Sequence, residues 1–325
     1  MNKHKPIKAI DLFAGVGGSS AGAVAAGVEV LAAIDCWGLA KKTYKDNFPN
    51  VRFVKQKCED VRMGELKKKI DKVDLIIASP ECTSHTCAKG NAPRSEKSRR
   101  TAFQVVRFAK AFMPRWIVIE NVVHMRSWKK YKSWLQDIRN LGYEVREQVI
   151  NAADHGVPQS RRRLFILCDR EKTPQSVEPT IKKRKTAASI IDRNGHFNFS
   201  PLRKKNRAAA TLSRANRAIR VVGKKTAFLI VYYGSDAAGG WQRTRVPLRT
   251  LTTLDRFGYV RPKKKKKGYE MRMLQVPEIR AAMGFPAKHG LNHGTRREKI
   301  KLLGNAVCPP VMKAVIRTLI GGNVR

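Results

Sequence analysis

The chain has 325 residues, and 67 lysines and arginines against 25 aspartates and glutamates give it a formal net charge of +42. This length suits two domains, or one large domain with an insertion. No apolar run is long enough to cross a bilayer, and the N-terminal residues lack the apolar core of a secretion signal, so we expect a cytoplasmic protein with no membrane partner. So strong a positive field attracts polyanions, and nucleic acid is the expected partner.

The six cysteines are scattered, with no Cys-x-x-Cys pair. Cys82, His85 and Cys87 lie close together, but no second pair of ligands follows at a suitable spacing. We therefore predict no metal site, and free thiols in a reducing compartment.

The chain begins with a nucleotide-type strand, turn and helix. Residues 8–13 form an apolar strand, residues 14–20 are rich in glycine, and residues 21–26 favour a helix. Glycines let the backbone approach a ligand that faces the N-terminus of a helix. The spacing departs from the G-x-G-x-x-G fingerprint, which argues against NAD.

Two carboxylates follow the next strands. Asp35 ends a strand at residues 28–35, where such folds hold ribose hydroxyls. Asp60 follows a third strand at residues 51–54 and could accept a hydrogen bond from an adenine amino group. Either acid could instead cap the helix that follows it.

Two further strands bring candidate catalytic groups to one edge. Residues 73–78 form a buried strand that Pro80 ends, and Cys82 follows in a loop. Residues 116–122 form a fifth strand that contains Glu120. Strands alternating with helices predict a doubly wound, mostly parallel α/β sheet, in which Cys82 and Glu120 face one pocket if their strands are neighbours. Alone, Cys82 could equally be a small apolar residue.

Residues 143–151 and 163–168 have the alternating pattern of two paired strands, and a basic turn separates them. Arg161 and Arg163 point to the same face of the second strand, where two guanidiniums can hold a phosphate or a carboxylate. The other interpretation is a solvated basic edge.

The second half of the chain differs from the first in its sequence pattern. From residue 171 to 268 the periodicity is poor, basic runs recur, and residues 228–233 form the one clear strand. This predicts a loop-rich basic domain or an insertion. Helices are expected at residues 128–141 and, after the basic region, at residues 272–284, 296–303 and 310–320, while residues 83–100 read as a loop.

Together these stretches resemble the cytosine-carbon-5 methyltransferases, which use S-adenosylmethionine. The resemblance covers most of the chain in the family's order. It rests on the motifs Asp11-Leu12-Phe13-Ala14-Gly15-Val16-Gly17-Gly18, Pro80-Glu81-Cys82, Glu120-Asn121-Val122, Gln159-Ser160-Arg161-Arg162-Arg163, Pro247-Leu248-Arg249-Thr250-Leu251-Thr252 and Gly304-Asn305-Ala306-Val307.

The resemblance implies a role for each motif. Cys82 would be the nucleophile, Glu120 and Arg163 would hold a flipped-out cytosine, and Arg161 would support them. The residues expected to line the S-adenosylmethionine site are Phe13, Gly15, Gly17, Asp35, Cys36, Asp60, Pro80 and Asn305. The residues expected to contact DNA are Thr86, Arg99, Gln159, Arg243, Arg245, Thr250 and Arg256.

The implied protein is a monomeric, sequence-specific DNA methyltransferase of a prokaryote or phage, with a restriction endonuclease as a separate partner. Its catalytic domain would comprise residues 1–170 completed by 271–325, and its target-recognition domain residues 171–270. The alternatives are a tRNA cytosine-5 methyltransferase, whose Cys-Phe-Thr tripeptide is missing here, and a catalytically silent DNA-binding protein.

Two positions depart from the family's pattern. Glu81 replaces the usual proline before the cysteine, as in a Pro-Glu-Cys branch of the family, and by itself would raise the pKa of the thiol. Cys36 occupies the place of a large apolar residue that stacks on adenine, and Trp37 follows it.

Overall fold

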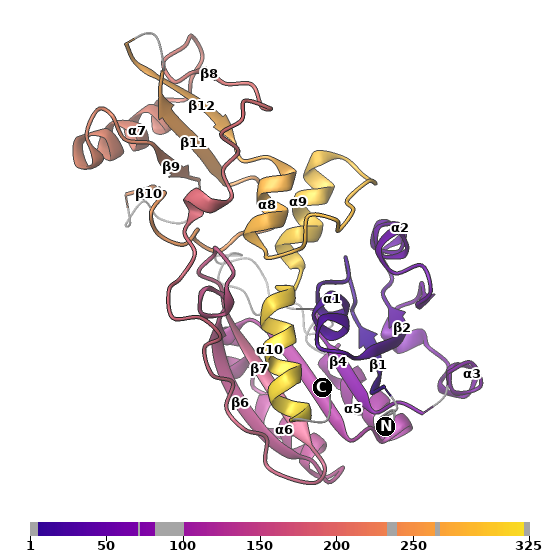
Figure 1. Cartoon of the computed structure of the whole chain (residues 1–325). Coiled ribbons are helices and arrows are strands. Elements are labelled where there is room, and N and C mark those ends of the chain that lie inside the picture. Colours follow the sequence, from indigo (N-terminus) through magenta and orange to yellow (C-terminus); the bar gives the residue numbers. More distant parts are fainter. Residues whose placement is uncertain (1–5, 71, 82–100, 233–238, 264–266, 322–325) are drawn as a thin grey trace, which may run out of the picture.

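A computed structural model describes residues 6–70, 72–81, 101–232, 239–263 and 267–321. These residues form a large sheet flanked by helices and a smaller sheet above it, with two helices between them (Figure 1). None of the described helices is both long and apolar enough to cross a membrane.

The large sheet has seven strands in the order β3-β2-β1-β4-β5-β7-β6. The first five pair in parallel, while β7 is antiparallel to both β5 and β6. The strands are β1 (Lys8–Leu12), β2 (Glu29–Ile34), β3 (Arg52–Val54), β4 (Leu75–Ala78), β5 (Trp116–Asn121), β6 (Glu144–Asn151) and β7 (Arg162–Asp169). The predicted mostly parallel α/β sheet is confirmed.

Strands β4 and β5 are direct neighbours, with Ala78 opposite Ile119. Glu120 therefore lies one position beyond the last paired residue of β4. Because parallel strands end at the same edge, the residues after Ala78 and the carboxylate of Glu120 meet there.

Helices cover both faces of this sheet, because each central strand buries alternate residues on opposite sides. On one face Leu75, Ile77 and Val118 pack in a core shared with α1 (Gly18–Ala25) and α10 (Pro309–Ile320). On the other face Ile76 and Ile117 pack in a core shared with α5 (Ala102–Phe112) and α6 (Tyr131–Arg139). The helices α2 (Gly38–Asn47) and α3 (Met63–Lys67) complete this part, with the 3-10 turns η1 (Cys58–Asp60), η3 (Val123–Ser127) and η4 (Ala152–His155).

The smaller sheet is antiparallel, with the order β10-β9-β11-β12-β8. Its elements are η5 (Ala187–Ser189), β8 (Ser200–Pro201), α7 (Ala209–Val222), β9 (Phe228–Val231), β10 (Trp241–Arg243), β11 (Phe257–Pro262) and β12 (Tyr269–Met273). The expectation of one clear strand is wrong here, although most of residues 171–270 lies in loops as predicted. The strands of this sheet are short and broken by basic and turn residues, which hides their alternation.

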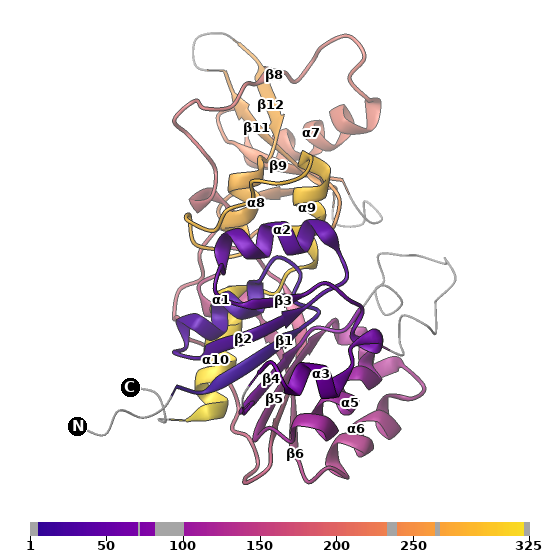
Figure 2. The same ribbon diagram turned by 90° about the vertical axis from the view of Figure 1, so that its right-hand side faces the viewer.

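Helices α8 (Val276–Ala282) and α9 (Arg296–Asn305) lie between the two sheets in both views (Figure 2). The helix expected at residues 272–284 begins later than predicted, because Arg272 and Met273 belong to β12. Gln275 and Glu278 form a capping box that fixes the start of α8.

Candidate active site

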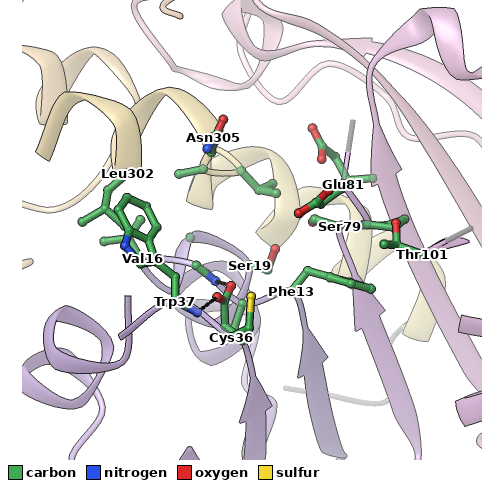
Figure 3. A pocket seen from close by; sticks show the side chains of 18 of the residues that line it. Phe13, Val16, Ser19, Cys36, Trp37, Ser79, Glu81, Thr101, Leu302 and Asn305 are labelled. Atoms are coloured by element: carbon green, nitrogen blue, oxygen red, sulfur yellow. Dashed lines mark hydrogen bonds between the residues drawn. The ribbon is translucent and has the colours of Figure 1, made fainter. Parts of the chain in front are cut away.

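A cavity of about 810 Å³ opens at the carboxyl edge of β1, β2, β4 and β5 (Figure 3). Residues from both ends of the chain line it, so helix α9 and the residues after it close a site that the N-terminal strands begin. The lining residues with predicted roles are Phe13, Gly15, Asp35, Cys36, Pro80, Glu120, Arg161, Arg163 and Asn305.

The turn after β1 forms one wall of the cavity. Phe13, Gly15 and Gly17 have φ angles of 61°, 52° and 84°, in the left-handed region. The N–H of Gly17 donates to the carbonyl of Ala14 (2.9 Å). Such a backbone brings main-chain atoms, rather than side chains, close to a ligand.

The close packing behind this turn explains the glycine at position 18. A Cβ atom on Gly18 would lie 2.2 Å from the carbonyl oxygen of Val307. The glycine therefore lets the turn sit directly against the chain that follows α9.

Asp35 joins the turn to the end of β2. Its Oδ2 accepts a hydrogen bond from the N–H of Gly15 (2.9 Å), and its Oδ1 accepts one from the N–H of Trp37 (2.8 Å). Burial raises the pKa of this carboxyl above its ordinary value, while the two amides act in the opposite direction. Asp35 thus fixes the shape of the turn as well as lining the cavity.

The side of the cavity that faces this turn carries the aromatic ring of Trp37, and the sequence indicated only some of the residues there. Trp37 lines the cavity beside the exposed Cys36, and the Nζ of Lys301 lies 5.0 Å from the Trp37 ring centroid. Figure 3 shows Trp37, Val16 and Leu302 together on one side of the cavity. No local motif links Lys301 or Leu302 to Trp37, because α9 approaches only in the fold.

Two residues predicted for the cofactor site are not among those lining the cavity. The side chain of Asp60 is exposed in η1, where Cys58 and Glu59 line the cavity instead. Gly17 belongs to the turn but packs against Phe48 and not against the cavity, since an added Cβ would be 2.5 Å from the Phe48 ring.

A buried ion pair lies at the edge of β5. Glu120 is 7% exposed, and its Oε1 is 3.3 Å from the Nε of Arg163. Burial raises the pKa of the Glu120 carboxyl, while the guanidiniums of Arg163 and Arg161 lower it by a smaller amount. The net result is a carboxyl that holds its proton more strongly than an exposed glutamate.

Arg161 connects three parts of the chain. It is buried, and its guanidinium donates to the carbonyl oxygens of Leu251 (3.0 Å), Gly304 (2.9 Å) and Ala306 (3.2 Å). These contacts hold the start of β7 against the segment after β10 and the end of α9. The alternative interpretation, a solvated basic edge, does not apply to Arg161.

A side-chain hydrogen bond ties the segment after β4 to the end of β5. Asn121 Nδ2 donates to the carbonyl of Pro80 (3.2 Å), and Glu81 follows as a cavity-lining residue. Cys82, the predicted nucleophile, is the next residue and lies outside the described residues.

The predicted DNA contacts fall into different environments. Arg243 and Arg245 are exposed, whereas Arg256 is partly buried and donates to the carbonyl of Tyr232 (2.7 Å). The Oγ1 of Thr250 donates to the carbonyl of Ser160 (2.9 Å). Thr86 and Arg99 lie outside the described residues.

Gln159, which was predicted to contact DNA, has no exposed surface in this structure. Its side chain is fully buried, its Nε2 donates to the carbonyl of Ala282 (3.0 Å), and its Oε1 accepts from the N–H of Leu251 (2.8 Å). Gln159 instead holds α8 and the Leu251 backbone together.

In the parts of the chain that the structure describes, no three His, Cys, Asp or Glu side chains gather as metal ligands would. The cavity lining combines the backbone of the glycine turn, the rings of Phe13 and Trp37, and charged side chains that include Asp35 and the Glu120–Arg163 pair.

The family model for C-5 cytosine-specific DNA methylases matches residues 7–321, and the chain belongs to this family. Its methyltransferases generally use S-adenosylmethionine. Among curated relatives, the Type II methyltransferase M.DdeI of Desulfomicrobium norvegicum is 38% identical over 53% of this chain and 44% of its own length. The Type II methyltransferase M.HgiDI of Herpetosiphon aurantiacus is 29% identical over 58% of this chain and 60% of its own. The chain thus spans about half the length of the curated relatives it matches.

Solved structures share the whole fold. A Spodoptera frugiperda DNMT2 mutant aligns with a TM-score of 0.70 at 18% identity, covering 97% of this chain and 99% of the other. A putative DNA modification methyltransferase encoded within an E. coli prophage aligns with a TM-score of 0.67 at 20% identity, covering 97% and 98%. At these identities the likeness concerns the fold.

Proposed function

We propose that this chain transfers a methyl group from S-adenosylmethionine to carbon 5 of a flipped-out cytosine in a short DNA sequence. One observation carries the proposal. The glycine turn of β1 and the Glu120–Arg163 pair line the same cavity, and Glu81, the residue before Cys82, also lines it.

The cavity fits S-adenosylmethionine. The turn at Gly15 offers backbone next to open space, because an added Cβ there would have no atom within 4 Å. Trp37 supplies an aromatic face, and Asp35 supplies a carboxylate at the place where such folds hold a ribose. Phe13, Gly15, Asp35, Trp37 and Asn305 are the residues that would hold the cofactor, which supplies an electrophilic methyl group when bound.

The chain's own residues would activate the base. Carbon 5 of cytosine is a weak nucleophile, and addition of the Cys82 thiolate to carbon 6 makes the ring electron-rich at carbon 5. Glu120 would hold a proton near nitrogen 3, where negative charge develops during this addition. Arg163 would hold the Glu120 carboxyl and favour the thiolate.

After methylation of carbon 5, a base removes the proton at that carbon. The electron pair of the broken C–H bond reforms the double bond, and the Cys82 thiolate leaves. The target carbon is inaccessible inside a duplex, so the cytosine must leave the stack to reach the cavity.

We propose that the small sheet and the segments that flank it contact the DNA. We assign residues 171–270 to target recognition and residues 1–170 with 271–325 to catalysis. The protein is proposed to act as a monomer on duplex DNA in the cytoplasm of a prokaryotic or phage-infected cell, and a restriction endonuclease of matching specificity is its proposed separate partner.

Tritium transfer from methyl-labelled S-adenosylmethionine tests this function. We expect label in duplex DNA and none in tRNA, and bisulfite sequencing of DNA from expressing cells should give one short methylated word. Transfer to tRNA alone would support the alternative substrate. Failure to label either nucleic acid would leave a silent DNA-binding protein as the better account.

A further inference from the structure

His289 reaches the proposed cofactor turn from the far end of the chain. Its Nε2 lies 3.0 Å from the carbonyl oxygen of Val16, a residue 273 positions earlier that lines the cavity. Both residues are buried, with exposures of 3% and 1%. Asp35 contacts the same turn at the N–H of the preceding residue, Gly15 (2.9 Å).

The tautomer of His289 follows from this geometry. Burial lowers the pKa of its imidazole to about 4, so the ring is neutral at physiological pH and carries one N–H. A carbonyl oxygen can only accept a hydrogen bond. The proton therefore resides on Nε2, and His289 donates to Val16.

The imidazole is held in place by its neighbours. Its centroid lies 4.5 Å from the Phe285 ring and 6.1 Å from the Phe48 ring. Phe48 is also the ring that an added Cβ on Gly17 would meet at 2.5 Å. The aromatic cluster that orients His289 is thus the packing surface behind the glycine turn.

The backbone around His289 is fixed as well. Gly290 exchanges two hydrogen bonds with the Asn47 side chain at the end of α2, at 2.7 and 3.0 Å. Arg280 donates to the His289 carbonyl (3.0 Å). Contacts from α2 and α8 therefore leave the imidazole little freedom to move away from Val16.

We propose that His289 is a positioning residue for the cofactor turn, holding the Val16 carbonyl so that the backbone of residues 13–16, which lines the cavity, keeps the shape that binds the ligand. Asp35 fixes the turn from the β2 side, and His289 fixes it from the α8–α9 segment. The proposal rests on the assignment of this turn to S-adenosylmethionine, because its effect is on binding of that ligand.

Two substitutions separate the hydrogen bond from the packing. His289→Phe keeps a ring between Phe48 and Phe285 but removes the donor, whereas His289→Gln keeps an N–H donor on a side chain of similar reach. We expect His289→Phe to raise the Kd for S-adenosylmethionine about tenfold, the scale of one missing buried hydrogen bond. We expect kcat at saturating cofactor to change less than twofold, and His289→Gln to restore the Kd to within about threefold of the wild type.

A control and a second measurement complete the test. His293→Ala removes a partly exposed histidine of the same segment, whose Nε2 lies 3.0 Å from Asp46, and should leave the Kd unchanged. Hydrogen exchange of the cofactor-free protein should be faster at residues 13–17 in His289→Phe and unchanged in β5. Wild-type affinity in His289→Phe, equal losses in the Phe and Gln variants, or uniformly faster exchange would each overturn the proposal. If the wild type itself binds no S-adenosylmethionine, the proposed function fails, whereas local exchange still reports on the turn.

Discussion

Arg163 places its Nε 3.3 Å from Oε1 of Glu120, where the antiparallel strand β7 begins beside the end of β5. An antiparallel strand at this position brings its first residues to the edge where the parallel strands end. The basic turn before β7 is therefore delivered to the cavity.

Glu120→Gln should slow methyl transfer by about two or more orders of magnitude, because an amide cannot supply the proton that a positioned acid provides. Burial raises the pKa of Glu120, so the acid form persists above the usual range of a glutamate and is lost as the pH rises. The wild-type rate should fall with rising pH on a limb that Glu120→Gln lacks. Single-turnover rates across pH measure both effects.

Glu147→Gln is the matched control for this variant. Glu147 lies on β6, has an arginine contact of the same length (Arg126 Nε, 3.3 Å) and does not line the cavity. We expect its single-turnover rate to stay within about threefold of the wild type. Equal losses in both variants would show that general charge, and not the acid at Glu120, sets the rate.

Asp11 should make folding stability depend on pH. Its side chain is fully buried in β1, and burial raises its pKa from 3.8 to about 7 although Ser20 donates to it. A raised carboxyl pKa stabilises the fold below pH 3.8, and this contribution is lost as the pH rises through about 7. Relative to Asp11→Asn, the wild type should lose stability across that window by at most about 1.4 kcal/mol per pH unit. Urea denaturation of both proteins at pH 4, 6 and 8 measures this, and parallel curves would contradict it.

Gly18→Ala should destabilise the protein by about 1–3 kcal/mol or more, since its Cβ would lie 2.2 Å from the Val307 carbonyl oxygen. Gly64→Ala in α3 is the control, because an added Cβ there meets no atom within 4 Å. That substitution should be neutral or gain up to about 1 kcal/mol from helix propensity. Thermal or urea melts would contradict the packing if the two variants lost the same stability.

The region around α7 should bind DNA phosphates. The sequence from Arg193 to Tyr232 contains no Asp or Glu, and Arg220, Lys224 and Lys225 are exposed at the end of α7. Replacing these three cations with alanine should lower the slope of log K against log salt by up to about 0.9 for each phosphate that is no longer neutralised. The affinity should fall equally for specific and unrelated duplexes.

The control changes the same number of positive charges at the end of α3 and just after it, away from the small sheet (Figure 1). Alanine at the exposed Lys67, Lys68 and Lys69 should alter the salt slope less. If both triple variants shift the slope equally, the contribution comes from net charge and not from a DNA-binding surface at α7.

Local sequence was sufficient for the central architecture. Buried parallel strands are continuous apolar runs, so the strands at residues 73–78 and 116–122 could be recognised from the sequence. They are neighbours in the sheet, as the site prediction required. Glu120 and Arg163 were assigned to one site by the family resemblance, and in the structure they meet where the antiparallel β7 begins beside the end of β5.

The rest depended on distant contacts. Gln159 and Arg161 sit in one polar motif, yet both are buried, because partners 90 to 145 residues away supply their hydrogen bonds. His289 carried no sequence signal, since its partner is a backbone carbonyl. The small sheet was missed because its strands are short and interrupted by charged residues.

The central claim is that Cys82 bonds to carbon 6 of the target cytosine. DNA with 5-fluorocytosine in the recognised word tests it, because fluorine cannot leave as a proton does and the adduct persists. The wild type and Cys87→Ser, a control thiol in the same stretch of sequence, should each form a denaturant-resistant complex with this DNA in the presence of S-adenosylmethionine. Cys82→Ser should form none, and a complex that survived this substitution, or its absence from the wild type, would contradict the account.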